Sequence, residues 1–301
     1  MVQLSALVLA YASVPRAADW QRGFQFAAFC CVLIAITRPA HAEVKRPTPG
    51  VTTTAGDPQS LEETLLGDAA LLDVCFVDLI TGWAVGERGV IWHTADGGVT
   101  WQRQKSNVSC RLNSICFIDA RRGWIAGGSS QAHGTTCGVL LQTEDGGATW
   151  AKVDGLSLPT IRRLRFFDAN HGMAMGEGSS MFPSGVFATR DGGRSWQSLP
   201  ADRAGRWLTG DFLDINTGAV AGAAGQFAAA ERRGLKHSPL IAKTLRSFHA
   251  LRLEAPATGW LVGDGGMVMT STDGGHSWQT PPSDLPEAAS MHFDFHAVAV
   301  A

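Results

Sequence analysis

One eight-residue pattern occurs four times in this chain and restricts its possible folds more than any other feature. The pattern is Ser/Thr-x-Asp-Gly-Gly-x-Thr/Ser-Trp, which we call the DGG turn. Its Asp can accept hydrogen bonds from nearby backbone N–H groups, its glycines allow positive φ, and its Trp places a large apolar ring in the next strand. We therefore predict structural roles for the Asp and Trp of each copy: Asp96 and Trp101, Asp145 and Trp150, Asp191 and Trp196, and Asp273 and Trp278.

The spacing of the four copies indicates a longer repeat. Successive Asp residues are 49, 46 and 82 residues apart, and the last interval is about twice 41, so one copy has been lost between Asp191 and Asp273. In each unit a short alternating strand comes first, and a second strand opens with Gly-Trp or a remnant of it. Four short strands in a repeat of this length are typical of a propeller blade. The sequence predicts an all-β fold, a β-propeller of four-stranded antiparallel blades.

Five blades are recognisable within residues 71–301, which we assign to the propeller domain. The fourth blade has lost both the DGG turn and its Trp, and Met291–Ala301 is predicted to be the first strand of a sixth blade. A propeller must close on itself to avoid open sheet edges. We therefore expect an incomplete seven-bladed propeller, truncated at its C-terminus.

The first part of the chain is predicted to direct export. Two arginines precede the apolar run Gly23–Ile36, and Ala40-His41-Ala42 offers a cleavage site, so residues 1–42 are predicted to be a signal peptide. An uncleaved membrane anchor is the alternative. Residues 43–70 contain three prolines and a Thr/Gly-rich run, which predicts a flexible linker. The expected location is the periplasm, the thylakoid lumen or the extracellular space.

The motifs of the first blade resemble those of the photosystem II stability/assembly factor family, seven-bladed propellers of Asp-box (BNR-type) repeats. The resemblance rests on Leu71–Asp78, Gly82–Gly86 and Thr94–Trp101. It implies an exported, non-enzymatic scaffold that binds a protein partner, such as a membrane-protein assembly intermediate, and in photosynthetic hosts a role in photosynthesis. The net charge of −2 gives no indication of nucleic-acid binding.

A glycan-binding or glycoside-hydrolase-like propeller is the alternative function. Sialidases with similar repeats use a Tyr nucleophile, but the one tyrosine, Tyr11, lies in the predicted leader. Other glycosidases need two carboxylates that face each other across a cleft, and the Asp residues of the DGG turns are engaged in their turns. No catalytic residue is therefore predicted. The histidines and cysteines lack zinc-site spacing, so neither metal nor cofactor is expected.

Arginines are the candidates for partner binding. The residue seven positions before the glycine of each Gly-Trp, or of its remnant, is predicted to face the central channel; in order these are Cys75, Cys116, Arg165, Asp211 and Arg252. In one interpretation, Arg165 and Arg252 form a basic patch with Arg162 and Arg163 that binds acidic segments of a partner. The other is a structural ion-pair series, Arg165–Asp211–Arg252. The sequence leaves both open.

The cysteines of the predicted mature chain fall into two pairs. Cys75 and Cys116 occupy equivalent positions in the first two blades, which indicates small packing residues between neighbouring first strands. Cys110 and Cys137 are expected at the same end of the second blade. Because export permits disulfides, a Cys110–Cys137 disulfide is predicted.

Overall fold

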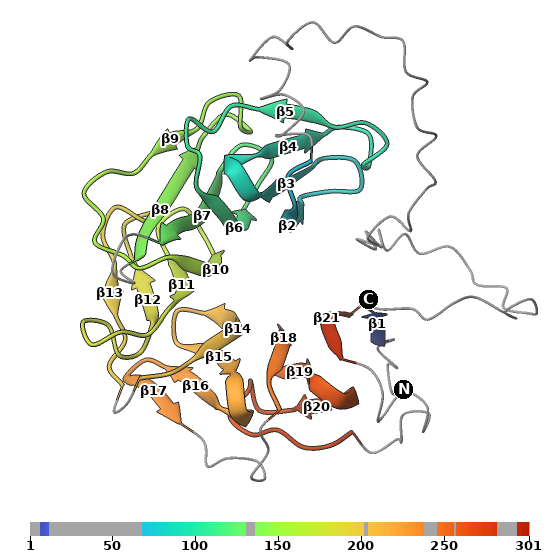
Figure 1. The fold of residues 1–301 in the computed structure, drawn as a ribbon, viewed down its shortest axis with the longest axis vertical. Coiled ribbons are helices and arrows are strands. Elements are labelled where there is room, and N and C mark those ends of the chain that lie inside the picture. The colour runs from blue at the N-terminus through green and yellow to red at the C-terminus, as the bar shows by residue number, and fades with distance from the viewer. Residues whose placement is uncertain are drawn as a thin grey trace, which may run out of the picture.

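The structure is a computed structural model, and it describes residues 7–11, 68–130, 136–201, 204–237, 246–255, 257–281 and 294–300. Five antiparallel sheets lie around a central axis with their first strands innermost (Figure 1). Each sheet corresponds to one predicted blade. The prediction of an all-β fold built from propeller blades is therefore confirmed.

The strands of blades 1 and 2 are β2 (Leu71–Phe76), β3 (Gly82–Gly86), β4 (Ile91–Thr94), β5 (Gln102–Gln104), β6 (Arg111–Phe117), β7 (Gly123–Ser130), β8 (Thr136–Thr143) and β9 (Ala151–Lys152). Those of blades 3 and 4 are β10 (Ile161–Phe166), β11 (Gly172–Gly176), β12 (Val186–Thr189), β13 (Gln197–Ser198), β14 (Trp207–Asp214), β15 (Thr217–Gly222), β16 (Phe227–Glu231) and β17 (Gly234–His237). Blade 5 contains β18 (Phe248–Glu254), β19 (Thr258–Gly263) and β20 (Val268–Ser271). Three short 3-10 turns, η1 (Glu87–Gly89), η3 (Ala223–Gly225) and η4 (Asp264–Gly266), join second and third strands.

Blades 4 and 5 depart from the repeat without losing the blade. Blade 4 keeps four strands although its DGG turn is gone, because Gly234 with φ 134° follows a short turn after β16. In blade 5 a single bridge between Thr270 and Gln279 stands where the fourth strand is expected. The length of the repeat therefore predicts a blade even where the DGG turn and its Trp are absent from the sequence.

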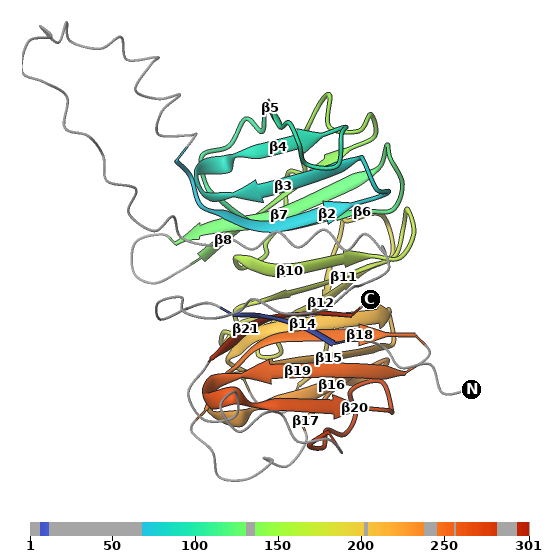
Figure 2. The ribbon, with the colours of Figure 1, turned by 90° about the vertical axis from the view of Figure 1, so that its right-hand side faces the viewer.

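The end of the chain forms the predicted opening strand of a further blade. This strand, β21 (Phe295–Val300), packs beside blade 5, where Phe295 is buried in one apolar cluster with Val262, and Trp260 and Val298 pack against that cluster. Its other edge pairs antiparallel with β1 (Leu7–Tyr11), with Leu7 opposite Val300 (Figures 1 and 2). No described sheet lies between this pair and blade 1, so closure of the propeller is not seen.

The pairing of β1 was not predicted, because its residues fall inside the segment assigned to the signal peptide. The rest of that segment, and residues 43–67 of the predicted linker, lie outside the described residues. Within the described part of the chain, no helix has the length and apolar character needed to span a bilayer.

Aromatic side chains pack the first two interfaces between blades. Trp83 of blade 1 stacks on Phe117 of blade 2, with ring centroids 3.7 Å apart, and its indole donates to the carbonyl of Gly146 at 3.2 Å. Blade 2 repeats this arrangement toward blade 3, where Trp124 stacks on Phe166 at 3.8 Å. The tryptophan of each Gly-Trp therefore belongs to the contact with the next blade.

The DGG turns have the geometry that their sequence predicts. In blade 2 the Asp145 carboxylate accepts hydrogen bonds from the hydroxyl and backbone N–H of Thr149, at 2.6 and 2.9 Å. The buried Thr143 hydroxyl donates to Asp145 at 2.7 Å and accepts from the N–H of Gly147 at 2.8 Å. The bonds from Thr149 lower the pKa of Asp145 to about 2. Because the other three turns repeat these bonds, the Asp side chains are engaged within their own turns.

Candidate functional site

The first strand of every blade has the same irregularity, and this irregularity directs its side chains. The pairing register between first and second strands shifts between the positions eleven and nine before the Gly-Trp glycine, as between Ile161 and Arg163. Such a bulge rotates the side chains that follow it. The residues nine and seven positions before the glycine then face the axis, while residues six positions before it, such as Phe117 and Phe166, pack against the preceding blade.

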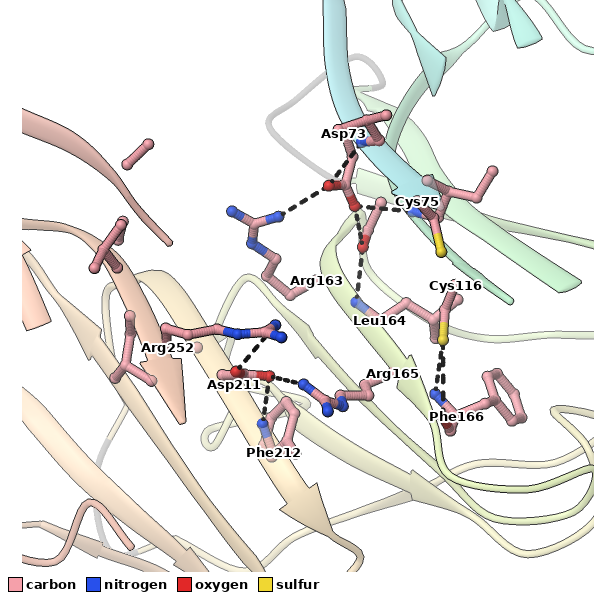
Figure 3. A pocket seen from close by; sticks show the side chains of 18 of the residues that line it. Asp73, Cys75, Cys116, Arg163, Leu164, Arg165, Phe166, Asp211, Phe212 and Arg252 are labelled. Carbon is pink, nitrogen blue, oxygen red and sulfur yellow. Dashed lines mark hydrogen bonds and ion pairs between the residues drawn. The ribbon is translucent and has the colours of Figure 1, made fainter. Parts of the chain in front are cut away.

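These axial residues line a cavity of about 590 Å³ at the centre of the described blades, which we call the channel pocket. It is bordered by β2, β6, β10, β14, β18 and β21, so every described blade contributes to it. Figure 3 shows its polar side chains directed toward the open centre. The five residues that the sequence places seven positions before the glycine all line it: Cys75, Cys116, Arg165, Asp211 and Arg252.

Many axial side chains join their strand to the first strand of the next blade. We call them bridging residues, because each accepts a hydrogen bond from a backbone N–H across the interface. Between blades 2 and 3, Ser114 accepts from the N–H of Leu164 at 3.2 Å, and the Cys116 sulfur accepts from that of Phe166 at 3.3 Å. Neighbouring first strands are not paired in a common sheet, so these side chains satisfy N–H groups that the sheets leave open.

The same contacts recur between blades 1 and 2 and between blades 4 and 5. Asp73 accepts from the N–H of Ile115 at 3.0 Å. Burial raises the pKa of the Cys75 thiol to about 11, against a smaller lowering by the backbone of Phe117. At the other interface, Thr209 accepts from Leu251 at 3.1 Å and Asp211 from Leu253 at 3.0 Å.

Blade 3 places arginines at both axial positions. A guanidinium has only donors, so neither Arg163 nor Arg165 can accept a backbone N–H from blade 4. Arg165 instead donates to the Asp211 carboxylate of blade 4 at 2.8 Å, and Arg163 reaches back to Asp73 of blade 1 at 3.6 Å (Figure 3). Arg252 of blade 5 lies 3.7 Å from the other Asp211 oxygen.

Three guanidinium groups and two carboxylates therefore face each other in the channel pocket. The arginine side chains keep 40%, 35% and 47% of their surface exposed at positions 163, 165 and 252. The carboxylates of Asp73 and Asp211 are engaged by backbone N–H groups. Burial raises the pKa of Asp73, although Arg163 and the hydrogen bonds oppose this shift. The pocket thus presents more unsatisfied donors than acceptors.

The structure bears on each residue predicted for partner binding. Arg163, Arg165 and Arg252 line the channel pocket, whereas Arg162 does not. Arg162 is the residue skipped by the register shift, and its guanidinium pairs with Glu177 at 2.7 Å. The ion-pair series Arg165–Asp211–Arg252 is formed. Its partial exposure leaves both sequence interpretations compatible, since paired arginines retain further donors.

The predicted Cys110–Cys137 disulfide is not present, and both residues are free thiols. Cys110 directly precedes β6 and Cys137 lies on β8, with β7 between these strands. Two strand spacings amount to about 10 Å, whereas a disulfide needs Cα atoms within about 7 Å. The two residues were predicted at one end of the blade, but β7 separates them.

Sequence analysis missed the axial positions nine residues before the glycine, where Asp73, Ser114 and Thr209 lie. Polar residues at the same place in successive strands were the available signal. Among the described residues, no group of three His, Cys, Asp or Glu side chains is arranged to hold a metal ion.

Comparison with known proteins links the N-terminal blades to a family. Residues 60–161 match the family model described as photosynthesis system II assembly factor YCF48. Over 59 residues the chain is 36% identical to the photosystem II stability/assembly factor HCF136, chloroplastic, of Oryza sativa subsp. japonica. That stretch covers 19% of this chain and spans 14% of the length of the rice protein.

Solved structures resemble the chain in fold. The structure of YCF48 bound to D1 peptide is 20% identical, covers 70% of this chain and 82% of that chain, and gives a TM-score of 0.45. An ancestral GH74 enzyme is 15% identical, the match covers 70% of this chain and 31% of the enzyme, and the TM-score is 0.50. Residues 60–161, about a third of the chain, are therefore similar to the YCF48/HCF136-like photosystem II assembly factors.

Proposed function

We propose that this protein is an exported, non-enzymatic scaffold that binds an extended segment of a protein partner in its channel pocket. The observation that carries the proposal is the set of three partly exposed arginines, Arg163, Arg165 and Arg252, around one cavity. Guanidinium groups bind carboxylates through paired, charge-assisted hydrogen bonds. A segment with acidic side chains or a terminal carboxylate suits this lining.

The similarity of residues 60–161 to assembly factors supports a protein as the partner. The matched family model and the rice relative are both named as photosystem II assembly factors. In that context a membrane-protein assembly intermediate is the partner we propose. Export and a place on the lumenal or periplasmic side rest on the predicted leader and on the name of the rice relative, which is chloroplastic.

The glycan alternative has less support from the geometry. A glycoside hydrolase needs one carboxyl group as acid and another as base or nucleophile. The two channel carboxylates, Asp73 and Asp211, instead accept backbone N–H bonds from the next blade. The likeness to a GH74 enzyme concerns the fold alone.

Substituting single arginines tests this proposal, with the D1 peptide as the first probe. Arg252→Gln removes a half-exposed donor whose distance to Asp211 is 3.7 Å, so its structural contribution is small. We expect affinity, measured by fluorescence anisotropy, to fall about tenfold, since a hydrogen bond to a charged group contributes about 1.5–3 kcal/mol. Arg162→Gln is the matched control, because Arg162 lies on the same kind of strand outside the pocket. Equal affinities of the two variants would contradict the proposal.

A further inference from the structure

The first strand of blade 1 has an apolar face that no described blade covers. In blades 2 and 3 the preceding blade packs on three apolar residues of the first strand, eleven, eight and six positions before the Gly-Trp glycine. All six are at most 8% exposed: Leu112, Ile115 and Phe117, and Ile161, Leu164 and Phe166. In blade 1 the same positions are Leu71, Val74 and Phe76, which we call the open face of β2 (Figure 1). Leu71 and Val74 are 36% and 41% exposed, and Phe76 is half-buried.

The aromatic ring of the open face has the same setting as the rings of the covered faces. A Cβ on Gly82 would lie 2.6 Å from the Phe76 ring, and a Cβ on Gly123 would lie 2.6 Å from the Phe117 ring. Each phenylalanine therefore lies against the glycine of its own blade. Phe117 also carries the stacked indole of Trp83, with ring centroids 3.7 Å apart. Among the described residues, no ring stacks on Phe76 in this way.

A backbone acceptor lies beside each of these phenylalanine rings. The indoles of Trp83 and Trp124 donate to the first glycine carbonyl of the next DGG turn, Gly146 at 3.2 Å and Gly192 at 3.0 Å. The corresponding glycine of blade 1 is Gly97, whose turn repeats the hydrogen bonds of the other DGG turns. No hydrogen bond from the described residues reaches the Gly97 carbonyl. The open face thus offers the ring and the acceptor that together hold an indole elsewhere in this chain.

We propose that the open face of β2 binds an extended segment of a protein partner that carries Trp, followed two residues later by a small apolar residue. The covered faces contain this pattern: Trp83 and Val85 lie in the cluster with blade 2, and Trp124 and Ala126 in the cluster with blade 3. Residues two apart in an extended strand share one face. A second copy of the chain is less suited, because the Gly-Trp tryptophans of the described blades are already packed: Trp83 and Trp124 are buried, and Trp260 packs beside β21.

The open face adjoins the channel pocket, because Val74 and Phe76 also line that pocket. The inference therefore deepens the proposed function and rests on it for a protein as the occupant. One segment would place its acidic group among the arginines and its Trp on Phe76. The Trp contacts involve β2 and the DGG turn of blade 1 but no arginine, so the two kinds of binding can be measured separately.

A neutral labelled peptide, Ser-Gly-Trp-Ala-Val-Gly-Ser with an acetylated N-terminus and an amidated C-terminus, tests the open face. Fluorescence anisotropy should show that the full chain binds it. Replacing Trp with Ala in the peptide should lower the affinity at least tenfold, because a buried aromatic ring supplies most of the contact in such a site. Replacing Trp with Phe should lower it about threefold to tenfold, because the hydrogen bond to the Gly97 carbonyl is lost.

A double variant of the chain, Leu71→Gln with Val74→Gln, makes the open face polar and should lower the affinity for the Trp peptide about tenfold or more. Both side chains are exposed, so the melting temperature should change little. Leu208→Gln is the matched control, because Leu208 is an apolar residue of the first strand of blade 4 and is 38% exposed. Unchanged affinity of the double variant, or equal binding of the Trp and Ala peptides, overturns the inference. A dimer that sedimentation detects in the parent chain and not in the double variant would assign the face to a second copy and would also overturn it.

Arg252→Gln separates this inference from the proposed function. The variant should bind the neutral Trp peptide as the parent chain does. If it also bound the D1 peptide normally, the proposed function would fail while the inference stands. If the Trp peptide did not bind the parent chain and D1 affinity still depended on Arg252, only the inference would fail.

Discussion

The interface between blades 2 and 3 and the interface between blades 3 and 4 are built from the same strand positions with opposite chemistry. At the first, Trp124 stacks on Phe166, and Ser114 and Cys116 accept backbone N–H groups from blade 3. At the second, methionine replaces the tryptophan and two arginines replace the bridging residues. The axial positions can therefore accept a backbone N–H from the next blade or supply the channel with positive charge, and an arginine does the second but not the first.

The tryptophan position provides the strongest test of this comparison. Trp124→Ala removes a side chain that is 1% exposed, its stacking on Phe166 and its hydrogen bond to the Gly192 carbonyl. We expect a loss of about 3–5 kcal/mol in unfolding free energy. Met173→Ala makes the equivalent change in blade 3 and should cost less, about 2 kcal/mol, because no indole bond is lost. Urea unfolding measures both, and a larger effect for Met173→Ala would break the comparison.

A bridging residue at an intact interface should have an intermediate effect. Thr209→Val keeps the shape of a buried side chain but leaves the N–H of Leu251 without its 3.1 Å acceptor. Loss of such a buried partner costs about 1–3 kcal/mol. Thermal unfolding of Thr209→Val beside Thr209→Ser, which keeps the hydroxyl, isolates the hydrogen bond. If the two variants were equally destabilised, packing rather than bridging would be responsible.

The smallest expected effect is a rise in stability, and it tests the difference between the two interfaces most directly. Arg163→Thr places in blade 3 the residue type that bridges from blade 4, within reach of the N–H of Gly210. We expect stability to rise by at most about 0.5–1 kcal/mol, because loss of the 3.6 Å contact between Arg163 and the buried Asp73 carboxylate offsets part of the new hydrogen bond. Affinity for the D1 peptide should fall in the same variant. If the variant lost stability and kept its affinity, the axial arginine would not be replacing a bridging hydrogen bond with a positive charge used for binding.

Most of the fold could be predicted because the hydrogen bonds of each turn depend on a few neighbouring residues, and because the repeat has nearly the same length in each blade. The DGG turn determines its own hydrogen bonds, so Asp145 and its equivalents were assigned correctly from eight residues of sequence. Counting back from the Gly-Trp glycine also placed Arg165, Asp211 and Arg252 on the channel, because one register holds in every blade.

What could not be predicted depends on contacts between distant segments. The bulge that separates Arg162 from Arg163 is a property of strand pairing, and neighbouring arginines in a sequence look equivalent. The predicted disulfide is absent because Cys110 and Cys137 lie on either side of β7, and the sequence indicates only which end of the blade they share. The pairing of β1 with β21 joins the two ends of the chain, and apolar character alone does not distinguish a strand from a leader.

The absence of bridging residues after blade 3 has a consequence for cooperativity. Bridging residues connect blades 1–3 to one another and blade 4 to blade 5, whereas blades 3 and 4 are joined by the ion pair Arg165–Asp211, by the bond from the Trp207 indole to the Ser184 carbonyl at 2.7 Å and by a shared apolar cluster. A ligand held by Arg163 and Arg252 would contact both groups at once, and its binding energy would be added to the junction between them. We expect calorimetry to show a higher melting temperature when the channel is filled. The ligand would then supply, on the axis between blades 3 and 5, contacts that the arginines of blade 3 do not make to backbone N–H groups.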